Sequence, residues 1–477
     1  MIAHTLERDP ANTARTTPAA APNLIVTNPA TGEQLGTLPQ QLPSDLPTIL
    51  ATARSGATIT RALSRHARAE ILDRTAQALR ARSTEFAELI VREAGKTITQ
   101  ARAEVARAAN TMLLSAGEAR RGGGEEIPFD AYAGADDRRG WFSREPLGII
   151  LAITPYNDAL NLVAHKLGPA IAGGNAVILK PAQQTPLTAR LLVDTLRESG
   201  LPMHTVTVVH GDRDLAQALV REREIRMVSF TGGFRTGEAI SANAGIKRLS
   251  MELGGNAPVL VFSDAELPRA VEACVSGAFW AAGQNCIGTQ RILVHASVYE
   301  EFRAAFVAAT ERLTTGDPRL DTTDVGPMIT PQAALAAADA IADAVTHGAR
   351  LLSGGTVDGP FFTPAVLESV PATHPLVSEE VFAPVVVLEQ FTTFEEAIEH
   401  ANRSEYALHA GVFTSNLATA MRAIDAIDAS GVMVNDSSDF RIDAMPFGGT
   451  KYGSMGREGV RFAYEEMTQP KVVCLRA

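Results

Sequence analysis

Apolar positions follow two different spacings along this chain. Between Leu46 and Arg120 they recur at helical intervals, as at Ile71, Leu72, Leu79, Phe86, Leu89 and Ile90. The glycines at 122–124 end this stretch. The pattern predicts an Ala/Arg-rich helical region in the first quarter of the chain, preceded by a strand-like patch at Leu24–Asn28.

From residue 148 the pattern changes to short apolar runs that alternate with helical segments. The expected strands are Gly148–Thr154, Ala176–Lys180, Thr205–His210 and Met227–Thr231, and the expected helices are Leu160–Ala172, Leu187–Ser199 and Leu215–Glu222. Strands separated by helices imply a parallel, doubly wound sheet of the nucleotide-binding type. A second α/β stretch begins near Glu252, with strand candidates at Val259–Phe262, Arg291–His295, Val385–Phe391 and Ala410–Thr414.

Composition narrows the class of protein. The 477 residues suggest two to four domains, and 45% apolar residues allow a large core. Lys and Arg total 43 against 54 Asp and Glu, a net charge of −11, which argues against nucleic acid as a partner. Pro, Gly and charges interrupt every apolar stretch, so we expect no membrane span. Three cysteines are too few for a disulfide scaffold, which predicts a reducing, cytoplasmic setting.

The first 23 residues show no periodicity and are interpreted as a flexible tail. They lack the apolar core of a secretory signal, and Glu7 and Asp9 argue against a transit peptide.

Among the cysteines, Cys286 is the candidate nucleophile. It follows Gly283, Gln284 and Asn285 in a polar loop, whereas Cys274, in a helical pattern, and Cys474, in a terminal strand, fit small buried apolar residues. A nucleophilic thiolate needs partial exposure and nearby donors, which such a loop supplies.

Two further residues could act with Cys286. Glu252 stands between apolar residues and before a Gly-Gly turn, so it is either a solvated strand-end glutamate or a buried base with a raised pKa. Asn157 follows an expected strand and is either a turn residue or an amide that donates to an oxyanion.

The cofactor signal is a Gly-rich turn between a strand and a helix. Gly232, Gly233 and Gly237 follow Phe230-Thr231 and could hold a pyrophosphate at the helix N-terminus. Lys180, at a strand end, is a second donor to ribose or phosphate.

Taken together, these segments resemble the aldehyde dehydrogenase superfamily over residues 24–477. The motifs, in family order, are Pro146-Leu147-Gly148 with Pro155-Tyr156-Asn157, Gly174-Asn175 with Lys180-Pro181, Phe230-Thr231-Gly232, Glu252-Leu253-Gly254-Gly255-Asn256, Gly283-Gln284-Asn285-Cys286, Glu379-Glu380-Val381-Phe382-Ala383-Pro384 and Pro446-Phe447-Gly448-Gly449 with Lys451. The lactaldehyde, non-phosphorylating glyceraldehyde-3-phosphate and phosphonoacetaldehyde dehydrogenases are the most similar branch.

The resemblance implies an α/β fold of two doubly wound parallel-sheet domains and a β oligomerisation arm. The implied divisions are an NAD(P)-binding domain over 24–124 and 147–253, a catalytic domain over 254–450, and an arm over 125–146 and 460–477. We expect a homodimer or homotetramer, with the strand Lys471–Arg476 joining the arm across a subunit interface.

The resemblance also implies residue roles. Cys286 would attack the aldehyde, its N–H and the Asn157 amide would form the oxyanion hole, and Glu252 would activate the water that hydrolyses the thioester. Contacts to NAD or NADP would come from Thr154, Pro155, Lys180, Gln183, Gly232, Gly233, Gly237, Leu253, Gly254, Glu380 and Phe382. No metal is implied.

Departures from the family pattern bear on the cofactor. Many NAD-preferring members carry Glu where this chain has Gln183, so NADP becomes plausible. Gly233 replaces a usual Ser, Ala383 replaces a usual Gly, and Arg235 adds a charge nearby.

The substrate is expected to be a small polar or anionic aldehyde. Arg107 and Arg441 could clamp an anionic group at the mouth of a substrate tunnel, beside Asn285, or could be surface salt-bridge formers. The phosphonate-using relatives often carry Arg at the position of Asn285. The alternatives are a neutral, lactaldehyde-like substrate and a catalytically silent member, but the latter would tend to lose Cys286 or Glu252.

Overall fold

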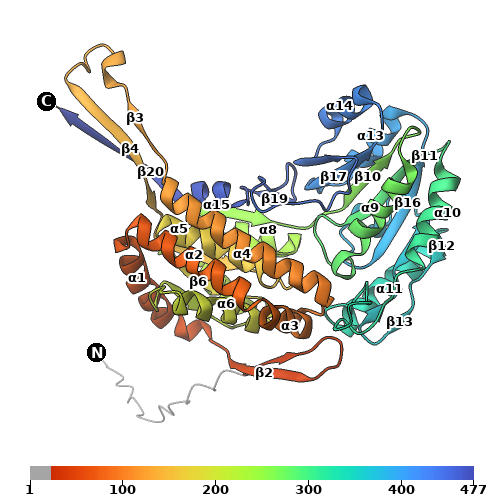
Figure 1. Ribbon diagram of the computed structural model, residues 1–477, viewed down its shortest axis with the longest axis horizontal. Helices are drawn as coiled ribbons and strands as arrows, with labels where there is room; N and C mark the ends of the chain where they lie inside the picture. The colour runs from red at the N-terminus through yellow and green to blue at the C-terminus, as the bar shows by residue number, and fades with distance from the viewer. Residues whose placement is uncertain (1–22, 477) are drawn as a thin grey trace, which may run out of the picture.

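The computed structural model describes residues 23–476, which form two lobes and a projecting arm (Figure 1). The expected tail over residues 1–23 therefore lies outside the described residues, apart from Asn23. That residue begins a β-hairpin of β1 (Asn23–Thr27) and β2 (Gln34–Pro39).

The predicted helical region between Leu46 and Arg120 is four helices. Ser64 and Thr97 begin two of them by accepting backbone N–H groups with their side chains, and Gly95 and Gly122 end two others in the left-handed conformation. After the short turn η1 (Pro43–Asp45), the helices are α1 (Leu46–Ala62), α2 (Arg65–Ala81), α3 (Ser83–Ala94) and α4 (Ile98–Arg121).

The first lobe is built on a six-stranded sheet in the order β19-β9-β8-β5-β6-β7. Only β19 runs antiparallel to its neighbour. After β5, the next two strands along the chain, β6 and β7, lie on one side of it. The following two strands, β8 and β9, lie on its other side, so the strand order reverses beside β5. The strands are β5 (Ile149–Ile153), β6 (Ala176–Lys180), β7 (Val206–Val208), β8 (Ile225–Thr231), β9 (Arg248–Glu252) and β19 (Ser454–Met455).

Helices cover both faces of this sheet. Ile150 and Leu179 pack with α2, α4, α5 and α6, whereas Leu151 and Ile178 face α1, α7 and α8. This two-sided burial explains why the strands are continuous apolar runs. The new helices are α5 (Asn161–Gly173), α6 (Pro186–Glu198), α7 (Arg213–Arg221) and α8 (Phe234–Asn243).

The second lobe is a seven-stranded sheet in the order β12-β15-β16-β11-β10-β17-β18, parallel except for β12. Its strands are β10 (Ala257–Val261), β11 (Thr289–His295), β12 (Arg350–Ser353), β15 (Ala365–Glu368), β16 (Val385–Phe391), β17 (His409–Phe413) and β18 (Gly431–Val434). One face packs on α9 (Leu267–Phe279), α10 (Tyr299–Thr310) and α11 (Pro331–Thr346), and the other on α13 (Phe394–Asn402) and α14 (Leu417–Ala426). Short elements are η3 (Trp280–Gly283), β13 (Val357–Asp358), β14 (Phe361–Phe362) and α12 (Pro375–Ser378).

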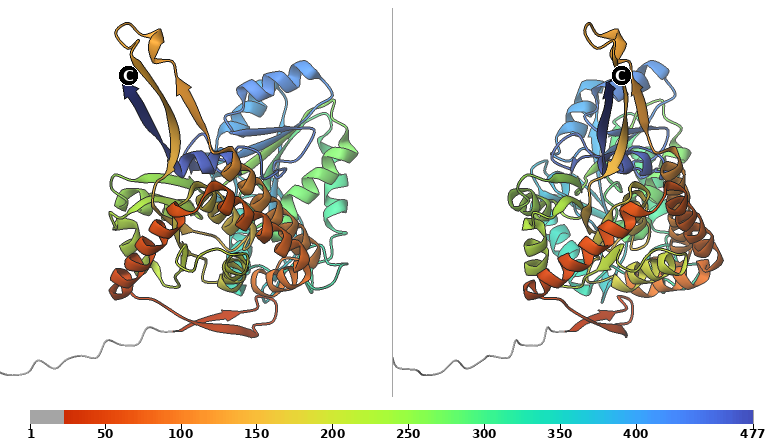
Figure 2. Two further views of the ribbon diagram at one scale, coloured as in Figure 1. Left: turned by 60° about the vertical axis from the view of Figure 1, so that its left-hand side comes forward. Right: turned by 90° about the vertical axis from the view of Figure 1, so that its left-hand side faces the viewer.

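The arm is a three-stranded antiparallel sheet that extends away from the lobes (Figure 2). It consists of β3 (Gly124–Ile127), η2 (Phe129–Ala131), β4 (Arg138–Pro146) and β20 (Thr468–Arg476), which follows α15 (Val460–Glu466). Because β20 pairs with β4 of its own chain, this ladder differs from the expected pairing across a subunit interface. Cys474 is exposed on β20, so the expectation that it is buried is wrong; Cys274 is buried as expected.

The predicted fold class is confirmed, and the strands predicted at 176–180 and 385–391 are β6 and β16 in full. The hairpin partner β2, the edge strands β12 and β18, and the interior strands β9 and β15 were not predicted. No helix within residues 23–476 is long and apolar enough to cross a membrane.

Two helical glycines provide a test of this packing. A Cβ on Gly56 of α1 would overlap the carbonyl group of His204, next to β7, whereas a Cβ on Gly117 of α4 would meet nothing within 4 Å. We expect Gly56→Ala to lower the free energy of unfolding by about 1–3 kcal/mol. Gly117→Ala, the matched control, should raise it by about 0.5–1 kcal/mol. Denaturant titrations followed by circular dichroism measure both, and equal effects would contradict the packing of α1.

Candidate active site

A cavity of about 560 Å³ is lined by residues from both lobes and contains five residues singled out from the sequence. Asn157 comes from the loop after β5, Arg107 from α4, and Asn285, Cys286 and Arg441 from loops of the second half of the chain. Ligands of doubly wound sheets bind outside the carboxyl ends of strands where the strand order reverses, which is where Asn157 follows β5.

The loop that carries Cys286 has an unusual backbone. Ala281, Ala282 and Gly283 all have positive φ values, of 52°, 54° and 68°. Such residues cost about 1–2 kcal/mol each when they carry a side chain and cluster at functional sites. Gly255 lies directly against the Cys286 carbonyl, where a Cβ would overlap it. The two motifs that contain Glu252 and Cys286 are therefore packed against each other.

The environment of the Cys286 thiol favours its neutral form. Burial raises the pKa of this half-buried residue, and the nearby Glu380 and Glu252 carboxylates raise it further, while Arg441 acts in the opposite direction. Arg441 is thus the cation that favours the Cys286 thiolate.

Glu252 is buried at the end of β9 and does not line the cavity itself. Neither carboxylate oxygen has a hydrogen-bond partner within the described part of the chain. Burial first, and then the neighbouring Glu458, raise the pKa of Glu252 well above its usual range. Glu252 is therefore buried and not a solvated strand-end glutamate, and its role as a base stays a prediction.

Sequence reasoning missed a buried ion pair at the floor of the site. Glu458 accepts hydrogen bonds from Lys166 Nζ at 3.1 Å, Thr231 Oγ1 at 3.2 Å and Arg441 Nη2 at 3.4 Å. Burial opposes ionisation, but Lys166 and Arg441 bring the pKa of Glu458 down to about 2. The available signal was Lys166, which follows His165 in the otherwise largely apolar sequence of α5.

Both predicted substrate arginines line the cavity and are also ion-paired. Arg107 donates to Asp158 at 3.4 Å and to Asp443 at 3.1 Å. The Arg441 guanidinium lies 3.7 Å from the ring centroid of Phe447 and pairs with Glu458. In each arginine, Nε has no partner among residues 23–476. The two interpretations, an anion clamp and salt-bridge formers, are thus compatible. Arg107 and Arg441 line the cavity, and their ion pairs with carboxylates hold them there.

The cavity also holds charges that were not predicted. Arg269 of α9 lines it without an ion-pair partner in the described chain. Glu272, Asp436 and Asp439 line it as well, and none of them forms an ion pair with a described residue. Burial and the nearby Asp436 raise the pKa of Asp439, although a Ser437 hydrogen bond opposes this. The cavity therefore presents both signs of charge to a ligand.

The expected dinucleotide residues gather around the N-terminus of α8. Gly233 is the N-cap, no side chain caps the helix, and the space where its Cβ would lie is open. A Cβ on Gly237 would come within 2.5 Å of Leu253, so this glycine allows α8 to pack closely on the turn after β9. Thr154 and Pro155 follow β5 beside β8. A helix terminus with free N–H groups suits a pyrophosphate.

A second cavity, of about 370 Å³, lies between α7 and α8 and suits the adenosine half of a dinucleotide. Lys180 lines it. Gln183 does not, and donates instead to the Gly211 carbonyl at 3.3 Å.

Glu380 and Phe382 lie beside the Cys286 loop. Glu380 accepts the Gly255 N–H at 2.9 Å, and burial raises its pKa to about 7. A Cβ on Gly254 would meet the same carboxylate. Phe382, with φ of 51°, packs edge to face on Tyr156 with 5.9 Å between ring centroids.

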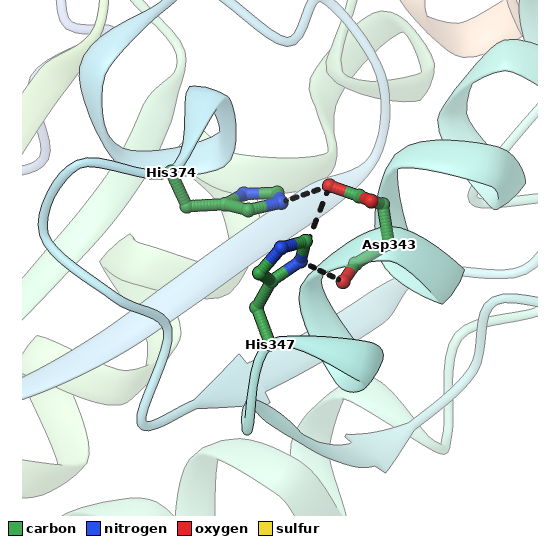
Figure 3. Close-up of side chains that lie close together, drawn as sticks. All are labelled: Asp343, His347 and His374. Carbon is green, nitrogen blue, oxygen red and sulfur yellow. Dashed lines mark hydrogen bonds and ion pairs between the residues drawn. The ribbon is translucent and has the colours of Figure 1, made fainter.

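One cluster of described residues has metal-binding side chains: Asp343, His347 and His374 (Figure 3). His374 Nδ1 accepts the Leu376 N–H, so its Nε2 carries the proton and donates to Asp343 at 3.0 Å. A metal on Nε2 would have to displace that proton. We interpret the cluster as a structural contact, in which Asp343 of α11 holds His374, the N-cap residue of α12.

Comparisons with known proteins agree with this geometry. A model of the aldehyde dehydrogenase family matches residues 16–473. Aspartate-semialdehyde dehydrogenase 1 of Pseudomonas canavaninivorans is 59% identical over 454 residues, which cover 95% of this chain and 97% of that protein.

Two solved structures are also similar. Aldehyde dehydrogenase 21 of Physcomitrella patens, in complex with the reaction product succinate, is 36% identical with a TM-score of 0.93 and covers 96% of both chains. Glyceraldehyde-3-phosphate dehydrogenase GapN of Methanocaldococcus jannaschii, complexed with NADP, is 36% identical with a TM-score of 0.91 over 95% of this chain and 99% of that one.

Proposed function

The chain belongs to the aldehyde dehydrogenase family, and from this premise we propose that it oxidises a small anionic aldehyde to the carboxylic acid through a thioester on Cys286. The family and its relatives make the chain an NAD(P)-dependent aldehyde oxidoreductase. The observation that carries the proposal is the shared cavity of Cys286, Asn157 and three arginines, with an unpaired, buried Glu252 behind it.

In this proposal Cys286 first loses its thiol proton, and the resulting thiolate, which Arg441 favours, adds through Sγ to the aldehyde carbon. The Asn157 amide, which no hydrogen bond within residues 23–476 engages, donates to the developing oxyanion together with the Cys286 N–H. One such donor is worth about 2.7–4 kcal/mol. The chemistry that bound NAD(P)⁺ supplies is acceptance of the hydride from the thiohemiacetal carbon, which leaves a thioester. The free α8 N-terminus and the cavity beside Lys180 fit that cofactor.

Glu252 then removes a proton from the water that hydrolyses the thioester. Its raised pKa makes it a stronger base than a solvated glutamate, and its lack of hydrogen-bond partners leaves both oxygens available. A CoA-acylating enzyme would not need this base, so its presence favours hydrolysis.

The charges of the cavity support a substrate that carries an anionic group. Arg107, Arg441 and Arg269 offer guanidinium N–H groups, with Asn285 beside them. Glu272 and Asp439, which form no ion pair with a described residue, add carboxyl acceptors that suit an ammonium group, although Asp439 also accepts a hydrogen bond from Ser437. An amino-acid semialdehyde carries both charges, and a relative named for aspartate semialdehyde is 59% identical.

The arm supports a further proposal, that the chain assembles with copies of itself as a dimer or tetramer. Trp141, Val472 and Leu475 are exposed on β4 and β20, and β20 ends the sheet with an unpaired edge. Proteins usually cover the exposed apolar edges of their sheets, and a second copy of this chain could cover this edge in a symmetric assembly.

Variants of Cys286 and Glu252 test the covalent route. We expect Cys286→Ala to abolish turnover without unfolding, while Cys474→Ala, on the exposed arm, stays active. Glu252→Gln should slow deacylation most, so that mass spectrometry detects acyl-enzyme on Cys286 after mixing with NAD(P)⁺ and aldehyde. Because a base acts only when deprotonated, the raised pKa predicts that turnover increases with pH across the neutral range. Wild-type turnover by Glu252→Gln would refute the base assignment.

The substrate's charge is tested with Arg107→Ala and Arg269→Ala. Each should raise KM for succinate semialdehyde and aspartate semialdehyde about 10- to 100-fold, because charge-assisted hydrogen bonds contribute about 1.5–3 kcal/mol. KM for lactaldehyde should barely change. Arg102→Ala is the control, since Arg102 lies on the same helix as Arg107 and pairs with Asp321 away from the cavity. Equal losses for charged and neutral aldehydes would favour a lactaldehyde-like substrate.

Assembly is measured by analytical ultracentrifugation. We expect a dimer or tetramer for the wild type and a smaller species for Val472→Asp, which places a charge on the exposed face of β20. The exposed Leu417→Asp in α14, away from the arm, should leave the assembly unchanged. A wild-type monomer would contradict the proposal.

A further inference from the structure

Arg107 shares its charge with two carboxylates beside the catalytic cavity. It donates to Asp158 at 3.4 Å and to Asp443 at 3.1 Å. Although burial favours the neutral forms, nearby cations and hydrogen bonds lower the pKa of both carboxyls, so both are ionised. Burial lowers the pKa of His165, which donates to Asp443 at 3.0 Å as a neutral ring. One guanidinium between two carboxylates would give this side of the cavity a net negative charge, which repels an anionic substrate.

A second cation, Lys96, lies behind the cavity. It belongs to the loop between α3 and α4, is 4% exposed and does not line the cavity. Its Nζ donates to Asp158 Oδ1, on the same carboxylate that accepts Arg107, and to Glu104 Oε2 at 2.7 Å. Burial opposes its charge, but Asp158 and Glu104 raise the pKa of Lys96, so the ammonium group is charged. Lys96 and Arg107 therefore hold the Asp158 carboxylate from two sides.

Glu104 is compensated largely by a helix. Its Oε1 accepts the N–H groups of Leu160 at 2.7 Å and Asn161 at 3.1 Å, at the start of α5, where no side chain of the N-cap residue does so. The positive end of the helix dipole favours a carboxylate at this position. Lys96 is therefore left to compensate Asp158.

We propose that Lys96 is a positioning residue that acts through Asp158 on Arg107 and allows the cavity to accept an anionic aldehyde. With Lys96 in place, two cations stand against Asp158 and Asp443, and this side of the cavity is close to neutral. Without it, Arg107 alone would face both carboxylates. The inference rests on the proposed function, since it requires that Arg107 meets the anionic group of the substrate.

The ratio of KM for succinate semialdehyde to KM for lactaldehyde measures this effect. Lys96→Met removes the charge and keeps a long, unbranched side chain, and we expect it to raise the ratio about tenfold. Lys96→Arg, which keeps the charge, should retain most of the wild-type ratio. A merely structural role for Lys96 would impair both aldehydes alike and leave the ratio unchanged.

A compensating substitution separates charge from packing. Asp158→Asn should lower the ratio, because it removes a negative charge beside Arg107. The double variant Lys96→Met/Asp158→Asn should return the ratio close to the wild-type value, since it removes one charge of each sign. If Lys96→Met alone does not fold, the double variant still measures the effect by comparison with Asp158→Asn, because the two proteins differ only at Lys96 and the double variant leaves neither partner unpaired.

Arg92→Met is the matched control. Arg92 lies four residues before Lys96, on α3, and pairs with Glu33 at the surface, where solvent and salt screen its charge. Its loss should leave the ratio unchanged.

Two results would overturn the role of Lys96: an unchanged ratio in folded Lys96→Met, or a double variant whose ratio stays as low as that of Asp158→Asn. Arg107→Ala, measured in the same assay, identifies which proposal has failed. If Arg107→Ala leaves the ratio unchanged, the anionic substrate of the proposed function is wrong and the role of Lys96 fails with it. If Arg107→Ala raises the ratio and Lys96→Met does not, only the role of Lys96 is wrong.

Discussion

The site depends on one buried ion pair, between Lys166 and Glu458. Lys166 lies in α5, whose residues are all buried, and its ammonium nitrogen is 3.1 Å from the Glu458 carboxylate. Removing Glu458 would leave the buried Lys166 ammonium without its ion-pair partner, at a cost of about 3–5 kcal/mol. The pair fixes the segment after β19 to the first lobe, and Glu458 in turn holds Arg441 beside Cys286. The same carboxylate raises the pKa of Glu252. One buried negative charge thus positions the Arg441 cation near the Cys286 thiol and raises the pKa of the Glu252 carboxyl.

Local patterns were sufficient to predict the elements whose environment is uniform. β6 and β16 each begin with four buried apolar residues, and this run is a clear signal of a strand buried on both faces. The motifs around Asn157, Glu252 and Cys286 were found because backbone constraints require small residues such as Gly255 at close contacts. Edge strands such as β12 were missed, because a half-exposed strand has a weak apolar signal, and the buried β15 was missed because its run of four residues is short.

Contacts between charged residues that are far apart in the chain could not be predicted from the sequence. Nothing near Arg107 in the chain indicates that its guanidinium meets Asp443, which lies more than 300 residues away. The same holds for Lys166 and Glu458, which are 292 residues apart. A motif can assign an arginine to a cavity, but only the tertiary structure shows whether a carboxylate pairs with its charge.

That distinction matters in the catalytic cavity. There, Arg107 and Arg441 are neutralised by internal carboxylates, so their main effect is rigid placement of N–H donors with little net field. A small substrate whose geometry must be controlled within a few tenths of an ångström benefits from fixed donors. The ion-paired Arg107 and Arg441 therefore suit the placement of a small substrate, while Arg269, which has no ion-pair partner in the described chain, adds a cation that no carboxylate neutralises.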